Sequence, residues 1–316
     1  MTKILVTGGA GFIGTNLVER LLSLAHIEKV RVLDNFSTGS RANLAGFNRH
    51  PKYEFMEGDI RDYPTCLAAC QDMHIISHQA ALGSVPRSIA DPLSTNAVNI
   101  TGTLNVFTAA KETGIRRVIY AASSSTYGDS TELPKLEHRI GKPLSPYAVT
   151  KYVNELYADV FANLYGMELI GLRYFNVFGP RQSPNGAYAA VIPLFLKHLF
   201  ANESPTIHGD GSTSRDFTYI ENVLQANCLA LFTENSEAVN QVYNVACGES
   251  TTLNELLAHL QKSVGSRLEP IYRADRLGNI PHSLADISKI QTLLGYKPMV
   301  KIEEGLQRTV EAFKNI

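Results

Sequence analysis

Short apolar runs alternate with helical stretches over the first 175 residues, and this alternation limits the possible folds more than any other feature. The runs lie at 3–8, 29–34, 53–59, 74–79, 116–123 and 168–174, and the helical stretches lie near 12–25, 62–71, 92–113 and 146–165. Strands that are apolar along their whole length are buried on both faces. The pattern therefore predicts an α/β fold with a doubly wound parallel sheet.

The pattern changes after about residue 178, where Pro and Gly become frequent. Short helices are expected near 192–202, 252–264 and 302–314, together with one strand in "QVYNVA". We therefore expect residues 1–177 to form a Rossmann domain and residues 178–316 to form a second, smaller mixed α/β domain. A later segment, at about 217–247, is expected to return to the first domain.

Composition and charge argue against several classes of protein. The net charge is −1 and the pI about 6.8, so there is no electrostatic basis for binding nucleic acid or an anionic membrane. No apolar run approaches the roughly 20 residues of a membrane span, and "MTKILVTGG" predicts a first strand rather than a signal peptide. Four cysteines in a chain of this length favour a cytoplasmic location. Cys66 and Cys70 lie four residues apart, but no His or Cys stands near them at metal-binding spacing, so no metal site is expected.

A glycine-rich turn follows the first strand. "VTGGAGFIG" places Gly8, Gly11 and Gly14 between that strand and the next helix. These glycines allow a tight turn, a close approach to a pyrophosphate and close helix–strand packing, while the helix N-terminus stabilises negative charge. Asp34 ends the second strand, where its carboxylate would accept hydrogen bonds from ribose hydroxyls and repel a 2′-phosphate. The turn and the acid together predict NAD as the cofactor. Asp59, at the end of the third strand, would lie near the adenine, although it has the alternative role of a helix cap.

Tyr147 and Lys151 stand four residues apart in "SPYAVTK" and share one face of the expected helix. An ammonium group beside a phenol lowers the pKa of the phenol from about 10, and a nicotinamide cation would act in the same direction. We therefore expect Tyr147 to act as a general base near neutral pH. The pair alone carries little weight, because a chain of this composition contains such a spacing by chance.

The weight of the pair comes from its context. "AASSSTYGD" places a cluster of hydroxyl residues at the end of the fifth strand. In an open parallel sheet, ligands bind beyond the carboxyl ends of the strands. A serine at the end of the fifth strand, one of Ser123, Ser124 and Ser125, would therefore point at the reacting carbon of a substrate, donate to a developing carbonyl oxygen and pass a hydrogen bond to Tyr147.

These stretches resemble the extended short-chain dehydrogenase/reductase family over the whole chain, through "TGGAGFIG", the Tyr–Lys pair and "RYFNVFGPRQ". More closely, "HQAALGSVPRS", "GKPLSPYAVTKYVNELYADVF" and "NGAYAAVIP" resemble nucleotide-sugar 4-epimerases, above all the bacterial UDP-N-acetylglucosamine 4-epimerases. The resemblance implies reversible C4 epimerisation of UDP-GlcNAc to UDP-GalNAc through a 4-keto intermediate, with tightly bound NAD. It also implies a homodimer in which the helices at 92–113 and 146–165 pair with their twins, whereas periodicity alone would equally allow a buried monomer core.

The resemblance also assigns residues to roles. The catalytic residues are Tyr147, Lys151 and Ser123. The residues expected to bind NAD are Gly8, Gly11, Phe12, Ile13, Gly14, Asp34, Asn35, Gly39, Asp59, Ile60, Gln79, Ala80, Ala81, Asn99, Tyr147, Lys151 and Tyr174. The residues expected to bind the UDP-sugar are Gly83, Ser84, Ser124, Ser125, Asn176, Ala190, Val191, His208, Arg215, Arg276 and Ser283. Arg215 and Arg276 match two arginines that clamp the diphosphate, for which bidentate guanidinium contacts are suited.

Ser283 is the clearest indication of the substrate. In simple UDP-galactose 4-epimerases this place can hold a large Tyr that closes the sugar pocket, whereas a serine, with Gly83 and Ser84 on the opposite wall, leaves room for an N-acetyl group. The alternatives are a UDP-glucose/UDP-galactose 4-epimerase and a UDP-uronic-acid 4-epimerase. Related dehydratases carry Asp-Glu where this chain has Ser125-Thr126, and this disfavours dehydration. A catalytically inactive NAD-binding module would usually have lost Tyr147 or Lys151.

Overall fold

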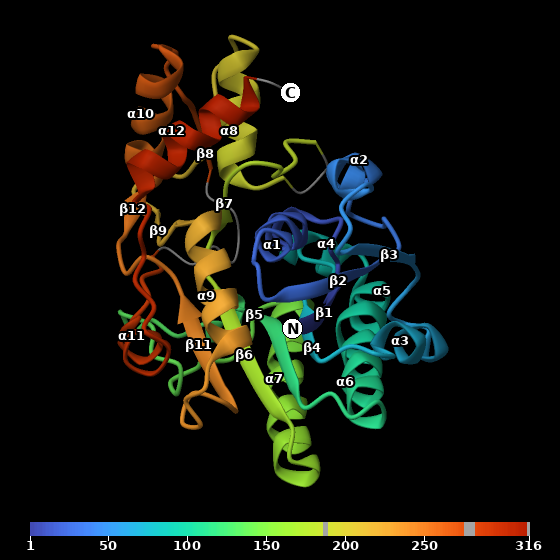
Figure 1. The fold of residues 1–316 in the computed structure, drawn as a ribbon. Helices are drawn as coiled ribbons and strands as arrows, with labels where there is room; N and C mark the ends of the chain where they lie inside the picture. The colour runs from blue at the N-terminus through green and yellow to red at the C-terminus, as the bar shows by residue number, and fades with distance from the viewer. Residues whose placement is uncertain (186–188, 275–281, 315–316) are drawn as a thin grey trace.

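The computed structural model describes residues 1–185, 189–274 and 282–314. Within these residues, seven strands form a parallel sheet in the order β11-β6-β5-β4-β1-β2-β3 (Figure 1). The strands are β1 (Thr2–Thr7), β2 (Ile27–Asp34), β3 (Tyr53–Glu57), β4 (Ile75–His78), β5 (Arg117–Ser123), β6 (Glu168–Tyr174) and β11 (Gln241–Val245). The first six match the predicted runs to within two residues at each end, and the predicted fold class is confirmed.

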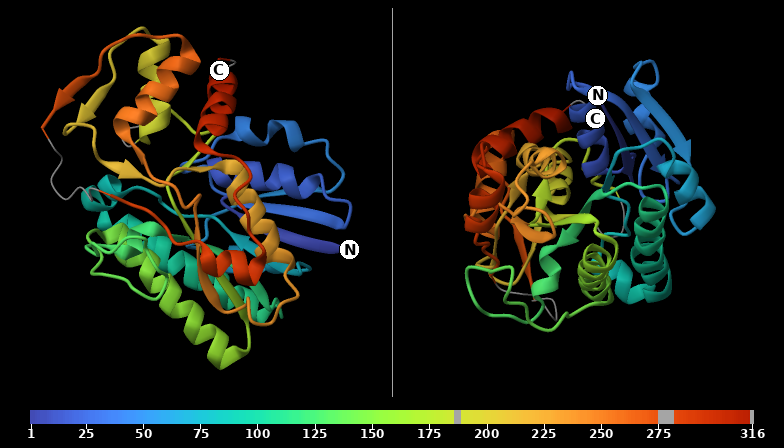
Figure 2. Two further views of the ribbon diagram at one scale, coloured as in Figure 1. Left: turned by 90° about the vertical axis from the view of Figure 1, so that its left-hand side faces the viewer. Right: turned by 60° about the horizontal axis from the view of Figure 1, so that its bottom comes forward.

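Two hydrophobic cores lie on opposite faces of this sheet. The flanking helices are α1 (Phe12–Leu22), α3 (Tyr63–Cys70), α6 (Thr103–Glu112), α7 (Pro146–Tyr165) and α9 (Ile220–Phe232). Ile4 and Val6 of β1 belong to the core that includes side chains of α1 and α9, whereas Leu5 belongs to the core with α3, α6 and α7. Successive side chains of a strand point to opposite faces. The apolar runs are therefore continuous because helices cover both faces (Figure 2).

The predicted helix at 92–113 contains a wide turn. It begins as α5 (Pro92–Asn96), passes through a π-helical turn, η2 (Ala97–Gly102), and continues as α6. Gly102 belongs to this turn, and a Cβ atom there would lie 2.6 Å from side-chain atoms of Ile60. The turn therefore lets the helix pack closely against the residues that follow β3.

Helix α7 carries the Tyr–Lys pair, and local signals define both of its ends. Ser145 accepts a hydrogen bond from the Ala148 N–H at 3.1 Å, and Pro146 occupies the first helical position. Gly166 ends the helix in the left-handed conformation, with φ of 63°. These are the preferred residues for a helix N-cap, first turn and C-cap, and the predicted range 146–165 is confirmed.

The remaining elements include helices from the second half of the chain that form the upper part of Figure 1. The remaining elements are α2 (Arg41–Leu44), η1 (Ala45–Phe47), α4 (Val85–Ala90), η3 (Ser124–Tyr127), β7 (Val177–Phe178), α8 (Val191–Phe200), β8 (Thr206–His208), β9 (Ser214–Arg215), β10 (Thr218–Tyr219), β12 (Thr251–Thr252), α10 (Leu253–Val264), β13 (Ile271–Arg273), α11 (Ser288–Leu294) and α12 (Ile302–Phe313). Each of the three helices predicted after residue 178 is present, as α8, α10 and α12.

Two elements from the second half of the chain lie on the central sheet. The strand predicted in "QVYNVA" is β11, which pairs with β6 at the edge of the sheet. Helix α9 was not predicted, because its buried residues are spread around the helix and include Asn222 and Asn227 as well as apolar side chains. A helix buried on several sides has no clear amphipathic period. The division of the chain after residue 177 stays a prediction.

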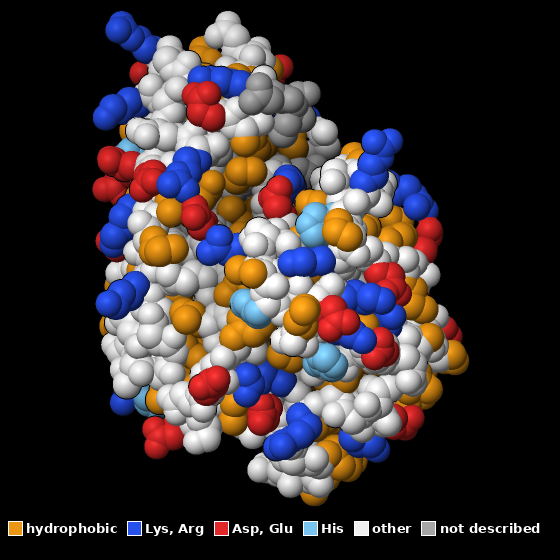
Figure 3. All heavy atoms as spheres, viewed as in Figure 1, with side chains coloured by type: hydrophobic (Ala, Val, Ile, Leu, Met, Phe, Trp, Pro, Cys, Tyr) orange, Lys and Arg blue, Asp and Glu red, His pale blue; other side chains and the backbone are white. Residues whose placement is uncertain are grey.

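Charges of both signs are mixed over the face shown in Figure 3, without a large area of one sign. None of the helices in the described part of the chain combines the length and apolar composition needed to cross a membrane.

A buried ion pair joins α7 to β6. Arg173 donates to both carboxylate oxygens of Glu155, at 2.9 and 2.6 Å, and the two side chains are only 3% and 6% exposed. Arg173 also donates to the Glu137 carbonyl at 3.0 Å, and its guanidinium lies 4.8 Å from the centre of the Tyr127 ring. Such a pair is costly to break on one side, because the remaining charge stays buried without its partner.

We predict that Glu155→Gln lowers the free energy of unfolding by about 3 kcal/mol or more, since it leaves the Arg173 guanidinium without a buried counter-charge. The matched control is Glu304→Gln, which removes an exposed pair with Arg308 on α12 and should cost less than about 1 kcal/mol. Urea denaturation measures both variants. Equal destabilisation by the two substitutions would contradict the importance of the buried pair.

Candidate active site

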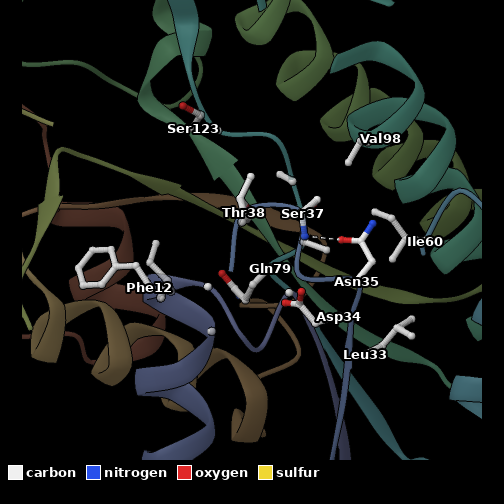
Figure 4. Close-up of a pocket in the computed structure, with 18 of the residues that line it drawn as sticks. Phe12, Leu33, Asp34, Asn35, Ser37, Thr38, Ile60, Gln79, Val98 and Ser123 are labelled. Atoms are coloured by element: carbon white, nitrogen blue, oxygen red, sulfur yellow. Dashed lines mark hydrogen bonds between the residues drawn. The ribbon is translucent and has the colours of Figure 1, made fainter. Parts of the chain in front are cut away.

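A cavity of about 420 Å³ lies beyond the carboxyl ends of the central strands. Most of the residues predicted to bind the cofactor and all three predicted catalytic residues line it. They are Gly8, Gly11, Phe12, Ile13, Gly14, Asp34, Asn35, Asp59, Ile60, Gln79, Ala80, Ala81, Ser123, Tyr147, Lys151 and Tyr174. Figure 4 shows how Phe12, Asp34, Gln79 and Ser123 approach this space from different elements. The parallel sheet therefore brings together residues that are far apart in the chain.

The glycine turn forms one wall of this cavity. Gly8 has φ of +70°, and a Cβ atom there would lie 2.6 Å from the Ala80 nitrogen. A Cβ atom on Gly14 would lie 2.1 Å from the Gly8 carbonyl oxygen, so only glycine allows α1 to pack this closely against the turn. No side chain caps the N-terminus of α1 at Gly11. The backbone N–H groups of the first helical turn can therefore bind a pyrophosphate, and the turn fits a dinucleotide.

Asp34 is held at the end of β2 by backbone groups. One carboxylate oxygen accepts from the Ala10 N–H at 2.9 Å, and the other accepts from the Phe36 N–H at 2.7 Å. A carboxylate has about four acceptor positions, so two of these bonds leave room for ribose hydroxyls. The glycine turn and the acid therefore fix each other.

Asp59 accepts a hydrogen bond from Asn35 Nδ2 at 2.8 Å, and Arg61 donates to it at 2.6 Å. The hydrogen bond from Arg61 is the main cause of the lowered pKa of Asp59. The alternative role of a helix cap is wrong for Asp59, because Asp62 caps α3 by accepting from the Thr65 N–H.

Ser37 and Thr38 also line the cavity and were not predicted, although they follow Asp34 closely in the sequence.

The catalytic candidates are buried together. Lys151 Nζ donates to the Ala121 carbonyl of β5 at 2.7 Å and lies 6.0 Å from the centre of the Tyr147 ring. Burial lowers the pKa of Lys151 to about 8, against an opposing effect of Glu155. Burial also raises the pKa of Tyr147, and a hydrogen bond with Ser123 opposes this rise. The expectation that Lys151 lowers the pKa of Tyr147 is therefore corrected. Without a bound cofactor, burial is the largest effect on this pKa and raises it. The hydrogen bond with Ser123 is the interaction that favours the phenolate.

A buried hydrogen-bond network supports the site from behind. The His78 ring nitrogens bond to Thr7 Oγ1 at 2.7 Å and to Thr103 Oγ1 at 2.9 Å. Thr103 donates its hydroxyl hydrogen to the Asn99 carbonyl, so it accepts from His78 Nε2–H. Burial lowers the pKa of His78 to about 3, with a smaller effect of Lys151, and the ring therefore stays neutral.

Two residues predicted to bind NAD lie behind the cavity wall instead of lining it. Asn99 accepts from the Leu82 N–H at 2.8 Å and donates to Thr150 Oγ1 at 3.1 Å, so it joins the 80–84 loop to α7. Gly39 lies against the glycine turn, since a Cβ atom there would meet the Ala10 backbone at 2.7 Å. Both positions support residues that line the cavity.

Helix α9 contributes a support that the sequence did not reveal. Tyr174 donates to Gln79 Oε1 at 3.1 Å, and Asn227 Nδ2 of α9 donates to the Tyr174 hydroxyl at 2.9 Å. Asn227 Oδ1 also accepts from Gln79 Nε2 at 3.1 Å. These bonds orient two cavity residues at the ends of β4 and β6, the strands on either side of β5, and only a correct prediction of α9 would have indicated Asn227.

The predicted substrate residues are more dispersed. Gly83 lines the cavity, and nothing lies within 4 Å of the position of a Cβ atom on it. Ser84 caps α4 by accepting from the Arg87 N–H, and Ser125 donates to Ser123 Oγ at 2.9 Å. The others lie outside the lining of this cavity: Ser124 in η3, Asn176 after β6, Ala190 and Val191 at the start of α8, His208 in β8, Arg215 in β9, and Ser283. Arg276 lies outside the described residues.

None of the four cysteines is among the residues that line this cavity. All four cysteines are free thiols, and burial raises the pKa of Cys66 and of Cys70 to about 12. In the ranges 1–185, 189–274 and 282–314, no group of His, Cys, Asp and Glu residues is arranged to hold a metal ion.

Comparison with known proteins identifies the family. The model of the NAD dependent epimerase/dehydratase family matches residues 4–246. A putative UDP-glucose 4-epimerase of Methanocaldococcus jannaschii is 38% identical over 314 residues, which cover 99% of this chain and 98% of that protein. The UDP-N-acetylglucosamine 4-epimerase of Methanobrevibacter ruminantium, solved with UDP-N-acetylmuramic acid, superposes with a TM-score of 0.93 at 40% identity over 99% of this chain and 98% of the other.

A UDP-glucose 4-epimerase of Thermotoga maritima, solved with UDP-glucose, superposes with a TM-score of 0.92 at 36% identity, covering 99% of both chains. The resemblance to nucleotide-sugar epimerases is thereby confirmed, and NAD is the cofactor of the family. With the glycine turn, Asp34 and Tyr147 around one cavity, the chain belongs to the NAD-dependent epimerase/dehydratase family.

Proposed function

We propose that this protein is a UDP-sugar 4-epimerase that interconverts UDP-GlcNAc and UDP-GalNAc. The observation that carries the choice of substrate is Gly83, which lies in the same cavity as Tyr147 and Ser123 and leaves open space beside it. The N-acetyl group on C2 of the sugar needs such space in the wall of the sugar site. The similarity to a UDP-N-acetylglucosamine 4-epimerase supports the proposal, while the similarity to UDP-glucose 4-epimerases keeps plain hexoses as the main alternative. UDP-uronic acids are the second alternative.

The residues of the cavity wall divide the work of the reaction. Tyr147 removes the proton from the C4 hydroxyl and returns it to the epimerised product, since its hydroxyl shares a hydrogen bond with Ser123 inside a buried site. Ser123 donates to the oxygen that becomes the 4-keto group. Lys151 is anchored on the Ala121 carbonyl, 6.0 Å from the centre of the Tyr147 ring, and its ammonium group adds positive charge to the site. Bound NAD supplies a reversible hydride acceptor and a positive charge that favours the phenolate.

The remaining cavity residues hold the cofactor in place. The first turn of α1 binds the pyrophosphate, and Asp34 accepts from the adenosine ribose. Tyr174 and Gln79, oriented by Asn227, line the same cavity and would support the bound cofactor. Because the cofactor is regenerated in each cycle, no added NAD is required when it stays bound.

The proposal includes a homodimer in the cytoplasm. Leu156, Val160 and Leu164 form a stripe on α7 at four-residue spacing and are 47%, 46% and 69% exposed. Ile89 of α4 is 64% exposed, and α4 packs beside α7. Contiguous apolar surface of this kind marks an interaction site, and a two-fold dimer covers such a surface with its own copy.

We predict that purified protein converts UDP-GlcNAc to UDP-GalNAc without added NAD, with a higher kcat/KM than for UDP-glucose. Tyr147→Phe should lower kcat by about 10² to 10⁴, because it removes the general base, while the variant keeps its bound NAD. Tyr152→Phe, on the same helix, is the matched control and should keep its turnover. Separation of the nucleotide sugars at equilibrium measures the products. Normal turnover by Tyr147→Phe would contradict the proposed mechanism, and faster turnover of the plain hexoses would contradict the proposed substrate.

We predict that Ser283→Tyr lowers kcat/KM for the acetylated pair at least about tenfold more than for UDP-glucose, since a large side chain would fill the space proposed for the N-acetyl group. Ser236→Tyr, on the exposed loop before β11, is the control for a general effect of tyrosine and should change neither value. Steady-state kinetics with both substrate pairs tests this expectation. An equal loss on the two pairs would show that Ser283 does not select the sugar.

We predict that Leu156→Asp shifts the protein from dimer to monomer in sedimentation velocity, because it places a charge in the proposed apolar interface. Met299→Asp, at an exposed apolar residue before α12, should leave the dimer unchanged. A wild-type protein that sediments as a monomer at micromolar concentration would contradict the proposed dimer.

A further inference from the structure

The segments that carry the proposed substrate residues meet at one buried carboxylate, that of Asp216. This side chain is fully buried and follows Arg215 directly. One carboxylate oxygen accepts from the Cys247 N–H at 2.9 Å, and the other accepts from the Gly248 N–H at 3.0 Å and the Ala285 N–H at 3.3 Å. The described structure shows backbone N–H groups, and no cation, as the partners of these oxygens.

The same residue is tied to Asn176 through its backbone. Asn176 Nδ2 donates to the Asp216 carbonyl at 3.1 Å, and the Thr218 N–H donates to the Asn176 carbonyl at 3.3 Å. Asn176 has φ of 36°, an uncommon conformation that its surroundings must hold in place. The position of Asn176 therefore depends on the segment around Asp216, which lies between β9 and β10.

Ser283 is tied to β9, the strand that directly precedes Asp216. The Ser283 N–H donates to the Ser214 carbonyl at 3.1 Å, and Ser214 Oγ bonds to His282 Nδ1 at 2.9 Å. Two residues later, the Ala285 N–H reaches the Asp216 carboxylate. Arg215, Asn176 and Ser283, which come from three segments, thus share one anchor.

We infer that Asp216 is a positioning residue for the UDP-sugar: its ionised carboxylate holds these three segments in register, so that its loss weakens substrate binding without removing NAD or the chemical step. This inference rests on the proposed function, because it assigns Arg215, Asn176 and Ser283 to the substrate. Of the residues that line the cofactor cavity, Val177 follows Asn176 directly, whereas Asp34, Tyr147 and Lys151 lie on elements that share none of these bonds.

The charge state of Asp216 matters to this role. Burial raises its pKa to about 6, against the lowering effect of the three N–H groups, and Glu249 adds to the rise. Above this pKa the carboxylate accepts all three bonds, and below it one oxygen carries a proton and becomes a donor that faces N–H groups. The other groups around it are Arg215, Cys247 and Tyr296; burial raises the pKa of Cys247 to about 12 and that of Tyr296 well above its ordinary value, so neither titrates between pH 5 and 8.

The test measures the Kd of UDP-GlcNAc by calorimetry in a Tyr147→Phe background, which prevents turnover. If another UDP-sugar of the substrate panel binds more tightly, that sugar is used. We expect Asp216→Asn to raise this Kd about tenfold or more at pH 7.5. In the variant, an NH₂ group replaces one of the two charged oxygens and faces a backbone N–H donor, so at least one hydrogen bond is lost. The absorbance of bound NAD should not change. Asp210→Asn is the matched control, since that exposed carboxylate bonds only within its own turn, to Ser212, and it should bind normally.

The pH dependence gives a second readout that does not require the variant to fold. A UDP-sugar diphosphate does not titrate between pH 5 and 8, so the protein with Asp216 intact should lose affinity several-fold between pH 7.5 and pH 5.5, and Asp216→Asn should lose this dependence. His282→Gln should retain the dependence, which separates Asp216 from the neighbouring histidine.

Three results would overturn the inference: normal affinity in Asp216→Asn, a flat pH profile with Asp216 intact, or an unchanged pH profile in the variant. Failure of every UDP-sugar to bind would instead overturn the proposed function, and the inference with it.

Discussion

The parallel register of the central sheet is the constraint on which the site depends. β1 pairs with β2 and β4, so Thr7 lies beside Leu33 and His78, and β5 pairs with β6, so Ser123 lies beside Tyr174. Parallel strands end at one edge of the sheet, and loops there can converge on a ligand. The glycine turn, the acid of β2 and the serine of β5 meet because their strands run in the same direction.

Desolvation shapes the chemistry of this edge. Burial raises the pKa of Tyr147 and lowers that of Lys151 to about 8, so desolvation shifts both groups toward their neutral forms. Proton transfer becomes possible because the site also contains groups that favour charge: Ser123 at the phenol and Glu155 near the ammonium. Glu155 is itself held by Arg173, so the buried ion pair connects the stability of α7 to the electrostatics of the cavity. A low local dielectric makes each of these interactions stronger than it would be in water.

The sequence predicted the structure correctly where a local signal determines it. It did not predict features that depend on contacts between distant segments. The six N-terminal strands, the glycine turn and the ends of α7 follow from apolar runs, glycines and caps. The π-helical turn at Asn99 and the helix α9 do not, because tertiary packing determines them. The same limit applies to the pKa of Tyr147: the spacing to Lys151 indicates proximity, but the extent of burial, which decides the direction of the shift, is a property of the folded chain.

The two halves of the site are built on different physical principles. The cofactor half is made by consecutive strand ends, so the stability of the sheet also maintains its geometry. On the substrate side, short strands such as β9 and β10 contribute only two residues each, too few to fix a position by backbone pairing alone. Polar side chains take the place of the backbone hydrogen bonds that longer strands would make. Asn244, fully buried in β11, donates to the Lys135 and Asp286 carbonyls at 2.8 and 3.0 Å. Asp216 likewise joins separate segments, as an acceptor of backbone N–H groups. A site held by a few charged or amide groups is sensitive to single substitutions and to pH, whereas many backbone hydrogen bonds of the sheet maintain the positions of the strand ends.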